Sequence, residues 1–289
     1  MKKFHQALLF AGAVTFTLTA CGNDTNSLAD AGESYSPENP VHVKVGITGT
    51  DSPEWDEISE IAAEEGIELE IVRFSDYTQP NQALADGSID INAFQTVSFF
   101  DNFKEEHNLD LTAIGSTVLA PMGLYSDKYE SVEDIPDGAD ITIDKEVTNQ
   151  ARNLMLLAEA GLIELEDDFG VTSGLNQIKA NPKNLNLTEI APATAPRIMQ
   201  DVDAAVINNG FAVDAGLSPT DDAIYREDET ATPYINIIAA QTEEQDNPVL
   251  LRLVELYQSE EIEQLIIEEH KGARIPTFIS LEELNSYPK

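Results

Sequence analysis

One arginine stands out among the residues whose type and position could do chemistry. The stretch DKEVTNQARNLMLLAEAGLI, from Asp144 to Ile163, reads as a helix that Thr148 caps, with Arg152 in its first turn. Because the start of a helix carries partial positive charge, a cation there is mildly unfavourable. The chain has only 16 Lys and Arg against 53 Asp and Glu, so a scarce cation in this place favours a functional role over a solvated side chain.

Aromatic and amide side chains follow several predicted strands. FSDYTQPN (74–81) and FQTVSFF (94–100) place aromatic residues where α/β sheets form ligand crevices, although each aromatic taken alone is explained as well by core packing. Asn208 follows the strand DAAVI, and Asn236 lies in an apolar run where a buried amide must find hydrogen-bond partners. These residues are suited to holding a small polar molecule without changing it.

Sequence signatures of catalysis and cofactor binding are missing. GITGTDS has the wrong spacing for a dinucleotide-binding loop, and there is no Walker loop and no G-x-S-x-G elbow. The four histidines, at positions 5, 42, 107 and 270, are scattered, and the acidic clusters lack the pattern of a calcium loop. We therefore predict no catalytic residue, no cofactor and no metal, although an acidic carboxylate pair stays open as an alternative.

Composition and charge limit the class of protein. A hydrophobic fraction of 42% over 289 residues suits a globular protein, more readily of two domains than of one. The formal net charge of −37 argues against nucleic acid as a partner, since binding it requires arrays of Lys and Arg. A solvated, soluble surface explains the excess of acid; adaptation to a salty or alkaline medium is a weaker alternative.

The N-terminus has the layout of a secretory signal. Residues 1–20 begin with two lysines and continue with an apolar run that is too short to span a membrane. LTAC (18–21) looks like a bacterial lipobox, in which Cys21 would be acylated, for example with palmitate, and would begin the mature chain. An ordinary signal peptide that ends near a cysteine is the alternative. Residues 21–40 then predict a lipidated cysteine and a flexible tether.

The remaining sequence predicts an α/β fold in two series of strands and helices. The series indicate mainly parallel sheets with helices on both faces. In the first series we expect strands at 41–47, 67–74 and 89–93 and helices at 53–63, at 81–85 and through Asn108. In the second series, strands at 140–143, 185–190 and 204–207 accompany the helix of Arg152 and a helix at 194–199.

The final strand and helix, PYINIIAAQ and NPVLLRLVELYQS, could return the chain to the first lobe. Two segments would then cross between the lobes, near 120–125 and 234–238. The predicted division is residues 41–121 plus 234–289 for lobe 1 and residues 122–233 for lobe 2. A cleft between two lobes that are joined in this way is a natural ligand site and can close by a hinge motion.

Many collinear phrases resemble the methionine-binding lipoproteins of the NlpA and MetQ family, the receptors of methionine ABC importers. They include FSDYTQPNQALADGSIDINAFQ, DNFKEEHNLDLTAIG, DVDAAVINNGFAVDAGLSP and PYINII, and the resemblance runs from about His42 to Gly272. It implies a periplasmic-binding-protein fold and a binding protein rather than an enzyme. It also implies an ABC importer permease as partner, a monomer, and a lipid anchor that holds the protein on the outer face of the cell membrane.

The same resemblance implies roles for individual residues. Arg152 would grip the α-carboxylate of a bound amino acid, and this ligand would supply the negative charge that the arginine needs. Asn208 and Asn236 fall on positions that bind the ammonium and carboxylate groups of the ligand. Tyr77, Phe94 and Phe99 fall on positions that line the pocket for its side chain.

Two departures from the family pattern bear on the ligand. Where relatives commonly read F-Q-H-x-x-Y, this chain reads FQTVSF, so Thr96 replaces a histidine and Phe99 a tyrosine. Both changes remove hydrogen-bonding groups from the pocket. The ligand could therefore be methionine, a methionine derivative, another amino acid or a dipeptide. An acidic hydrolase and a surface adhesin are the alternatives of a different class.

Overall fold

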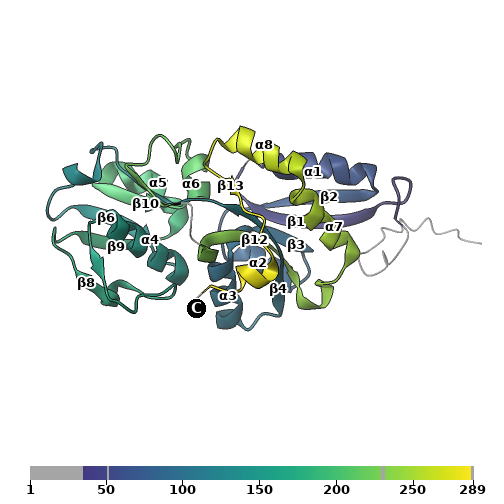
Figure 1. Ribbon diagram of the computed structural model, residues 1–289, viewed down its shortest axis with the longest axis horizontal. Helices are drawn as coiled ribbons and strands as arrows, with labels where there is room; N and C mark the ends of the chain where they lie inside the picture. Colours follow the sequence, from purple (N-terminus) through teal and green to yellow (C-terminus); the bar gives the residue numbers. More distant parts are fainter. Residues whose placement is uncertain (1–34, 51, 229–231, 288–289) are drawn as a thin grey trace, which may run out of the picture.

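A computed structural model describes residues 35–287, except Asp51 and residues 229–231. The predicted signal peptide, Cys21 and most of the predicted tether lie outside the described residues. Figure 1 shows two bodies side by side, each built around its own β-sheet with helices packed against it. We name them lobe 1, around the larger sheet, and lobe 2, around the smaller.

Lobe 1 is built on a six-stranded sheet in the order β13-β4-β12-β3-β1-β2. Its strands are β1 (Val41–Thr48), β2 (Ile67–Phe74), β3 (Ile91–Thr96), β4 (Leu111–Leu119), β12 (Ile235–Gln241) and β13 (Ile275–Pro276). Its helices are α1 (Pro53–Glu64), α2 (Gln79–Ala85), α3 (Val97–His107), α7 (Pro248–Tyr257), α8 (Glu260–His270) and α9 (Leu281–Leu284). The last strand and helix thus rejoin the N-terminal elements.

Lobe 2 is built on a five-stranded sheet in the order β11-β5-β10-β6-β9, beside a small hairpin. The strands are β5 (Gly123–Tyr125), β6 (Asp140–Asp144), β9 (Asn186–Ile190), β10 (Ala204–Ile207) and β11 (Tyr225–Arg226), and the hairpin is β7 (Glu164–Leu165) with β8 (Ile178–Ala180). The helices are α4 (Val147–Glu159), α5 (Ala195–Ile198) and α6 (Asn209–Asp214). The helix predicted at 194–199 is therefore a single turn, which 3-10 turns flank on both sides.

The prediction of mainly parallel sheets was wrong. Parallel pairing joins β1 to β2 and β3, and β6 to β9 and β10. The strands next to the lobe crossings run the other way: β12 is antiparallel to β3 and β4, and β5 is antiparallel to β10. A strand that enters a sheet from the other lobe is not tied to its neighbour by a helical crossover, so nothing in its connection requires parallel pairing.

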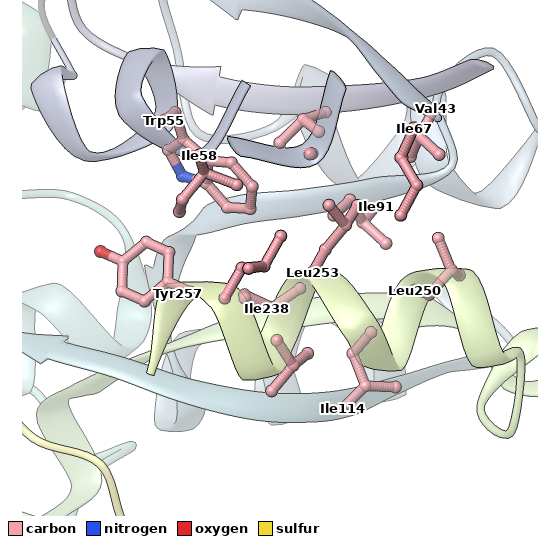
Figure 2. Close-up of a cluster of buried hydrophobic side chains, with 14 of the residues drawn as sticks. Val43, Trp55, Ile58, Ile67, Ile91, Ile114, Ile238, Leu250, Leu253 and Tyr257 are labelled. Atoms are coloured by element: carbon pink, nitrogen blue, oxygen red, sulfur yellow. The ribbon is translucent and has the colours of Figure 1, made fainter. Parts of the chain in front are cut away.

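Strand β12 passes through the centre of lobe 1 and divides its core in two. Ile238 points to the face covered by α1, α7 and α8, where Figure 2 shows it beside Leu253 and Tyr257. Its neighbour Ile237 points to the opposite face, among the side chains of α2, α3 and α9. The alternation follows from the twofold period of a strand, and it explains why the run INIIAA carries apolar side chains on both faces, with Asn236 as the polar exception.

Two connections join the sheets. The first runs from the end of β4 at Leu119 to the start of β5 at Gly123. The second leaves β11 at Arg226 and enters β12 at Ile235, so it comes earlier than the predicted crossing at 234–238, which is mostly strand. The segment before β13 also touches both lobes, because the Asn209 side chain of α6 donates to the carbonyl oxygens of Ala273 (2.7 Å) and Pro121 (3.3 Å).

Helix α8 offers a matched test of the core of lobe 1. Ile266 is fully buried against the cluster around α1 and α7, whereas Ile267, the next residue, is 46% exposed. We expect Ile266→Ala to lower the free energy of unfolding by about 2–5 kcal/mol, because it leaves a cavity. Ile267→Ala should change it by less than about 0.5 kcal/mol. Urea unfolding of both variants measures this, and equal losses would contradict the packing described here.

Candidate functional site

A cavity lies between the two lobes and is lined by both. Its empty volume is ≈ 870 Å³, which includes the solvent-open space at its mouth. Every residue that the sequence analysis assigned to ligand binding lies on its wall: Tyr77, Phe94, Thr96, Phe99, Arg152, Asn208 and Asn236. They come from β3, β12, α3 and the loop after β2 in lobe 1, and from α4 and the start of α6 in lobe 2.

Arg152 lies on the first long helix of lobe 2, but not in its first turn. Helix α4 begins at Val147 with Glu146 as its N-cap residue, so Thr148 is not the cap and Arg152 falls in the second turn. The start lies earlier because the Asp144 side chain accepts a hydrogen bond from the amide of Glu146 (2.9 Å), which turns the chain directly after β6. The helix dipole acts mainly on the first turn, so the argument that it disfavours a cation at position 152 was wrong.

Arg152 is nevertheless buried and strongly bound. Its Nε donates to both carboxylate oxygens of Glu227 (2.9 and 3.2 Å), and its Nη2 donates to Glu227 Oε2 and to the carbonyl of Ala120 (3.1 Å). The guanidinium also lies over the ring of Tyr234, 4.4 Å from its centroid. The expectation that a ligand supplies the negative charge was thus incomplete, since Glu227 already supplies one. No hydrogen bond to a described residue occupies Nη1.

Three aromatic rings form one wall of the cavity, and a fourth packs against one of them. The rings of Tyr77, Phe94 and Phe99 lie 5.9–6.3 Å apart between centroids, in tilted and edge-on arrangements. Phe211 of α6 faces Tyr77 from the other lobe at 4.8 Å. Such contacts favour the pairing of apolar surfaces, and they make this wall suitable for an apolar or thioether side chain. Burial, together with the charge of Asp144, raises the pKa of Tyr77, which keeps its hydroxyl neutral.

The two asparagines present free amides to the cavity. Asn236 of β12 is paired directly with Thr96 of β3, so the two residues lie side by side in the sheet of lobe 1. Asn208 is the N-cap residue of α6 but makes no capping bond with its side chain. Within the described part of the chain, neither amide has a hydrogen-bond partner. A half-buried amide without a partner is available to a ligand.

Thr96 has a structural role that a histidine would not share. Its hydroxyl accepts a hydrogen bond from the amide of Phe99 (3.3 Å) and caps α3. Threonine is a favoured N-cap residue because its short side chain reaches back to the helix. The departure from the family pattern therefore stabilises the start of α3 at the same position where it removes an imidazole from the cavity.

The sequence analysis missed a second ion pair at the cavity. Arg274 and Glu54 both line it, and Arg274 Nη1 donates to Glu54 Oε1 (2.7 Å). Burial alone would raise the pKa of Glu54, but the hydrogen bond from His270 and the charge of Arg274 lower it to about 2. The signal was present in the sequence, because Arg274 is another scarce cation in an acidic chain. Trp55, Asn149 and Tyr257 also line the cavity unforeseen.

Two further searches concern only the residues that the structure describes. No group of three or more His, Cys, Asp or Glu side chains there is arranged to hold a metal ion. None of the helices described is both long and apolar enough to cross a membrane.

Two α/β lobes around a cleft with a buried arginine, free amides and an aromatic wall define a substrate-binding protein of the periplasmic type. Protein PG110 of Staphylococcus aureus has this fold, with a TM-score of 0.82 and 42% identity over 84% of this chain and 97% of its own. A nutrient-binding protein of Burkholderia cenocepacia, solved bound to methionine, matches with a TM-score of 0.79 and 37% identity over 82% of this chain and 100% of its own.

Sequence comparison gives the family. The D-methionine-binding lipoprotein MetQ of Escherichia coli is 34% identical over 250 residues, which cover 85% of this chain and 92% of that protein. The NlpA lipoprotein family model matches residues 43–278. The chain therefore belongs to the NlpA lipoprotein family, and both the predicted resemblance and the predicted fold class are confirmed.

Asp144, the last residue of β6, gives a pH-dependent test of the structure that precedes α4. Its carboxylate is 2% exposed, Oδ2 has no partner among the described residues, and burial raises its pKa to about 7. Between pH 3.8 and about 7 the folded state therefore binds more protons than the unfolded state, and stability falls as the pH rises. We compare the free energy of unfolding of Asp144→Asn with that of wild type. We expect this difference to favour the variant by on the order of 2 kcal/mol more at pH 8 than at pH 5.

Urea unfolding at the two pH values measures the difference. Asp167→Asn is the matched control, because the side chain of Asp167 is fully exposed. An equal effect of Asp144→Asn at both pH values would show that the carboxyl does not titrate in this range.

Proposed function

We propose that this protein is the substrate-binding component of an ABC importer and that its cleft captures methionine or a closely related amino acid or short peptide. The observation that carries the proposal is the composition of the cleft: a guanidinium with a free nitrogen, two unpaired amides and an aromatic wall face one cavity. The relatives named for binding D-methionine, or solved with methionine, support the choice of ligand.

Each wall of the cleft suits one part of an amino acid. Arg152 offers Nη1 to the α-carboxylate, as an arginine does in charge-assisted pairs. Asn208 and Asn236 contribute carbonyl oxygens to the ammonium group and amide hydrogens to the carboxylate. Tyr77, Phe94 and Phe99 surround the side chain. Because Thr96 and Phe99 lack the imidazole and phenol of relatives, a dipeptide or another amino acid is the alternative ligand.

Binding explains the cleft better than catalysis does. Glu54 is held by Arg274 and His270, and Glu227 is held by Arg152. The low pKa of Glu54 makes that carboxylate a weak general base, and both oxygens of Glu227 already accept hydrogen bonds. The polar groups of the cleft therefore favour recognition of a ligand that leaves unchanged.

Closure of the two lobes over the ligand is the mechanism that we propose. Lobe 1 is taken as residues 41–121 plus 234–289 and lobe 2 as residues 122–233, since each range contains the strands of one sheet. Thr50 of lobe 1 donates to Asp214 of α6 in lobe 2 through its amide (3.2 Å) and hydroxyl (3.1 Å), and the ring of Tyr77 packs against that of Phe211. A ligand that touches both lobes binds the closed form preferentially and shifts the population towards it.

A double substitution tests the binding role of Arg152 without leaving a buried charge unpaired. Arg152→Met combined with Glu227→Gln removes both charges together, whereas Arg152→Ala alone would strand the carboxylate of Glu227. We expect the double variant to bind methionine at least ~30-fold more weakly, about 2 kcal/mol, because the ligand carboxylate loses its cation. Isothermal titration with L-methionine, D-methionine and methionyl dipeptides measures the change.

The control is the same pair of changes at a partly exposed pair, Arg252→Met with Glu65→Gln. It should leave the affinity unchanged. Undiminished binding in the cleft variant would remove Arg152 from the site, and wild-type protein that binds none of these ligands would overturn the proposed function.

The lipid anchor and the partners belong to the same proposal. Cys21 would carry the lipid and hold a monomer at the outer face of the cell membrane, where it meets the importer permease; membership of a lipoprotein family supports this. We expect Cys21→Ser to move the protein from the membrane fraction to the soluble fraction and to abolish labelling with palmitate. Labelled, membrane-bound Cys21→Ser protein would contradict the anchor.

A further inference from the structure

We propose that Glu227 sets the charge of the ligand that the cleft accepts, by neutralising Arg152 before any ligand arrives. The cleft then favours a zwitterion, with carboxylate and ammonium together, and discriminates against an otherwise identical anion. This inference rests on the proposed function, because it concerns the ligand of the same cleft. It adds a specificity-determining residue that lies behind the cavity wall.

The geometry makes Glu227 a permanent partner of Arg152. Both side chains are buried, with 7% and 5% of their surfaces exposed. Glu227 Oε2 also accepts a hydrogen bond from the amide of Met122 (3.1 Å). Since the carboxylate is fixed from two sides, a ligand carboxylate meets a guanidinium whose Nε and Nη2 are already engaged, and it must use Nη1.

The arginine and glutamate charges around the cavity balance without a ligand. The ionisable Arg, Lys, Asp and Glu side chains on its wall are Glu54, Arg152 and Arg274. Arg274 pairs with Glu54, and Arg152 pairs with Glu227. A carboxylate that enters alone therefore adds an uncompensated negative charge to a buried site, which is strongly unfavourable. An ammonium group on the same ligand restores the balance.

No Lys or Arg beyond Arg152 and Arg274 lines the cavity among the described residues. The ammonium of the ligand is therefore the group that offsets its carboxylate.

A purely structural role is the competing explanation for Glu227. The residue lies on the second connection between the lobes and holds Met122 of the first, so it could serve as a brace alone. Glu227→Gln separates the two roles. Glutamine keeps an acceptor oxygen for Met122 and Arg152 but removes the negative charge, so the cleft gains a net positive charge of one.

The experiment compares L-methionine with its 2-hydroxy analogue, 2-hydroxy-4-(methylthio)butanoate, in which a hydroxyl replaces the ammonium. We expect wild-type protein to bind the anionic analogue at least 100-fold more weakly than methionine. In Glu227→Gln this ratio should fall at least tenfold, because the free positive charge now favours the anion. Glu65→Gln, the same change at the partly exposed Arg252 pair, should keep the wild-type ratio.

Two results would overturn the inference while leaving the proposed function standing. One is wild-type protein that binds the two compounds within threefold of each other, and a second is a Glu227→Gln ratio within twofold of wild type, which would leave Glu227 as a brace. Wild-type protein that binds neither methionine nor methionyl dipeptides would overturn the proposed function itself.

A second measurement on wild-type protein covers the case that Glu227→Gln fails to fold. Titration of the analogue in buffers of different ionisation enthalpy reports protons taken up on binding. Uptake approaching one proton per analogue, with none for methionine, supports the inference, because a proton then replaces the missing ammonium charge. Equal uptake for both compounds would contradict it.

Discussion

The buried ion pair between Arg152 and Glu227 connects the parts of this protein that must act together. Arg152 belongs to a helix of lobe 2, and Glu227 lies on the chain that returns to lobe 1. The same guanidinium donates to Ala120 on the outgoing connection and lies over Tyr234 at the end of the returning one. A buried pair is weak evidence for stability, because desolvation opposes the attraction, but it fixes geometry closely. Here it fixes both segments that join the lobes to Arg152 on the cleft wall.

The secondary structure could be predicted from the sequence where a single local pattern determined it. Pro53 behind Ser52 opens α1 as expected, and the apolar alternation of β1 and β2 gives both strands nearly to the residue. It failed at α4, where a side chain outside the helix, that of Asp144, moves the start ahead of Thr148. It also failed for strand direction, since pairing between distant segments depends on how the chain crosses between the lobes, which local pattern does not record.

The residues of the candidate site could likewise be predicted only in part. Single residues after strands could be recognised, and the structure gathers them around one cavity. The partners behind them could not, because Glu227 lies 75 positions from Arg152 and looks like any other acid in a chain with 53 of them. Arg274 was as scarce a cation as Arg152, but it reaches the cleft from the segment before β13. The position of that segment beside β4 is determined by the tertiary structure and cannot be read from the local sequence.

The contacts that bridge the two lobes have a kinetic consequence. Gly49, with φ +91°, turns the chain after β1 so that Thr50 reaches Asp214, while Tyr77 and Phe211 meet from opposite lobes. A ligand that both lobes hold cannot depart until the lobes separate, so its residence time follows the opening rate of the lobes rather than its own bonds alone. These contacts, together with the hydrogen bonds of Asn209 to Ala273 and of Arg226 to Gly272, oppose that separation.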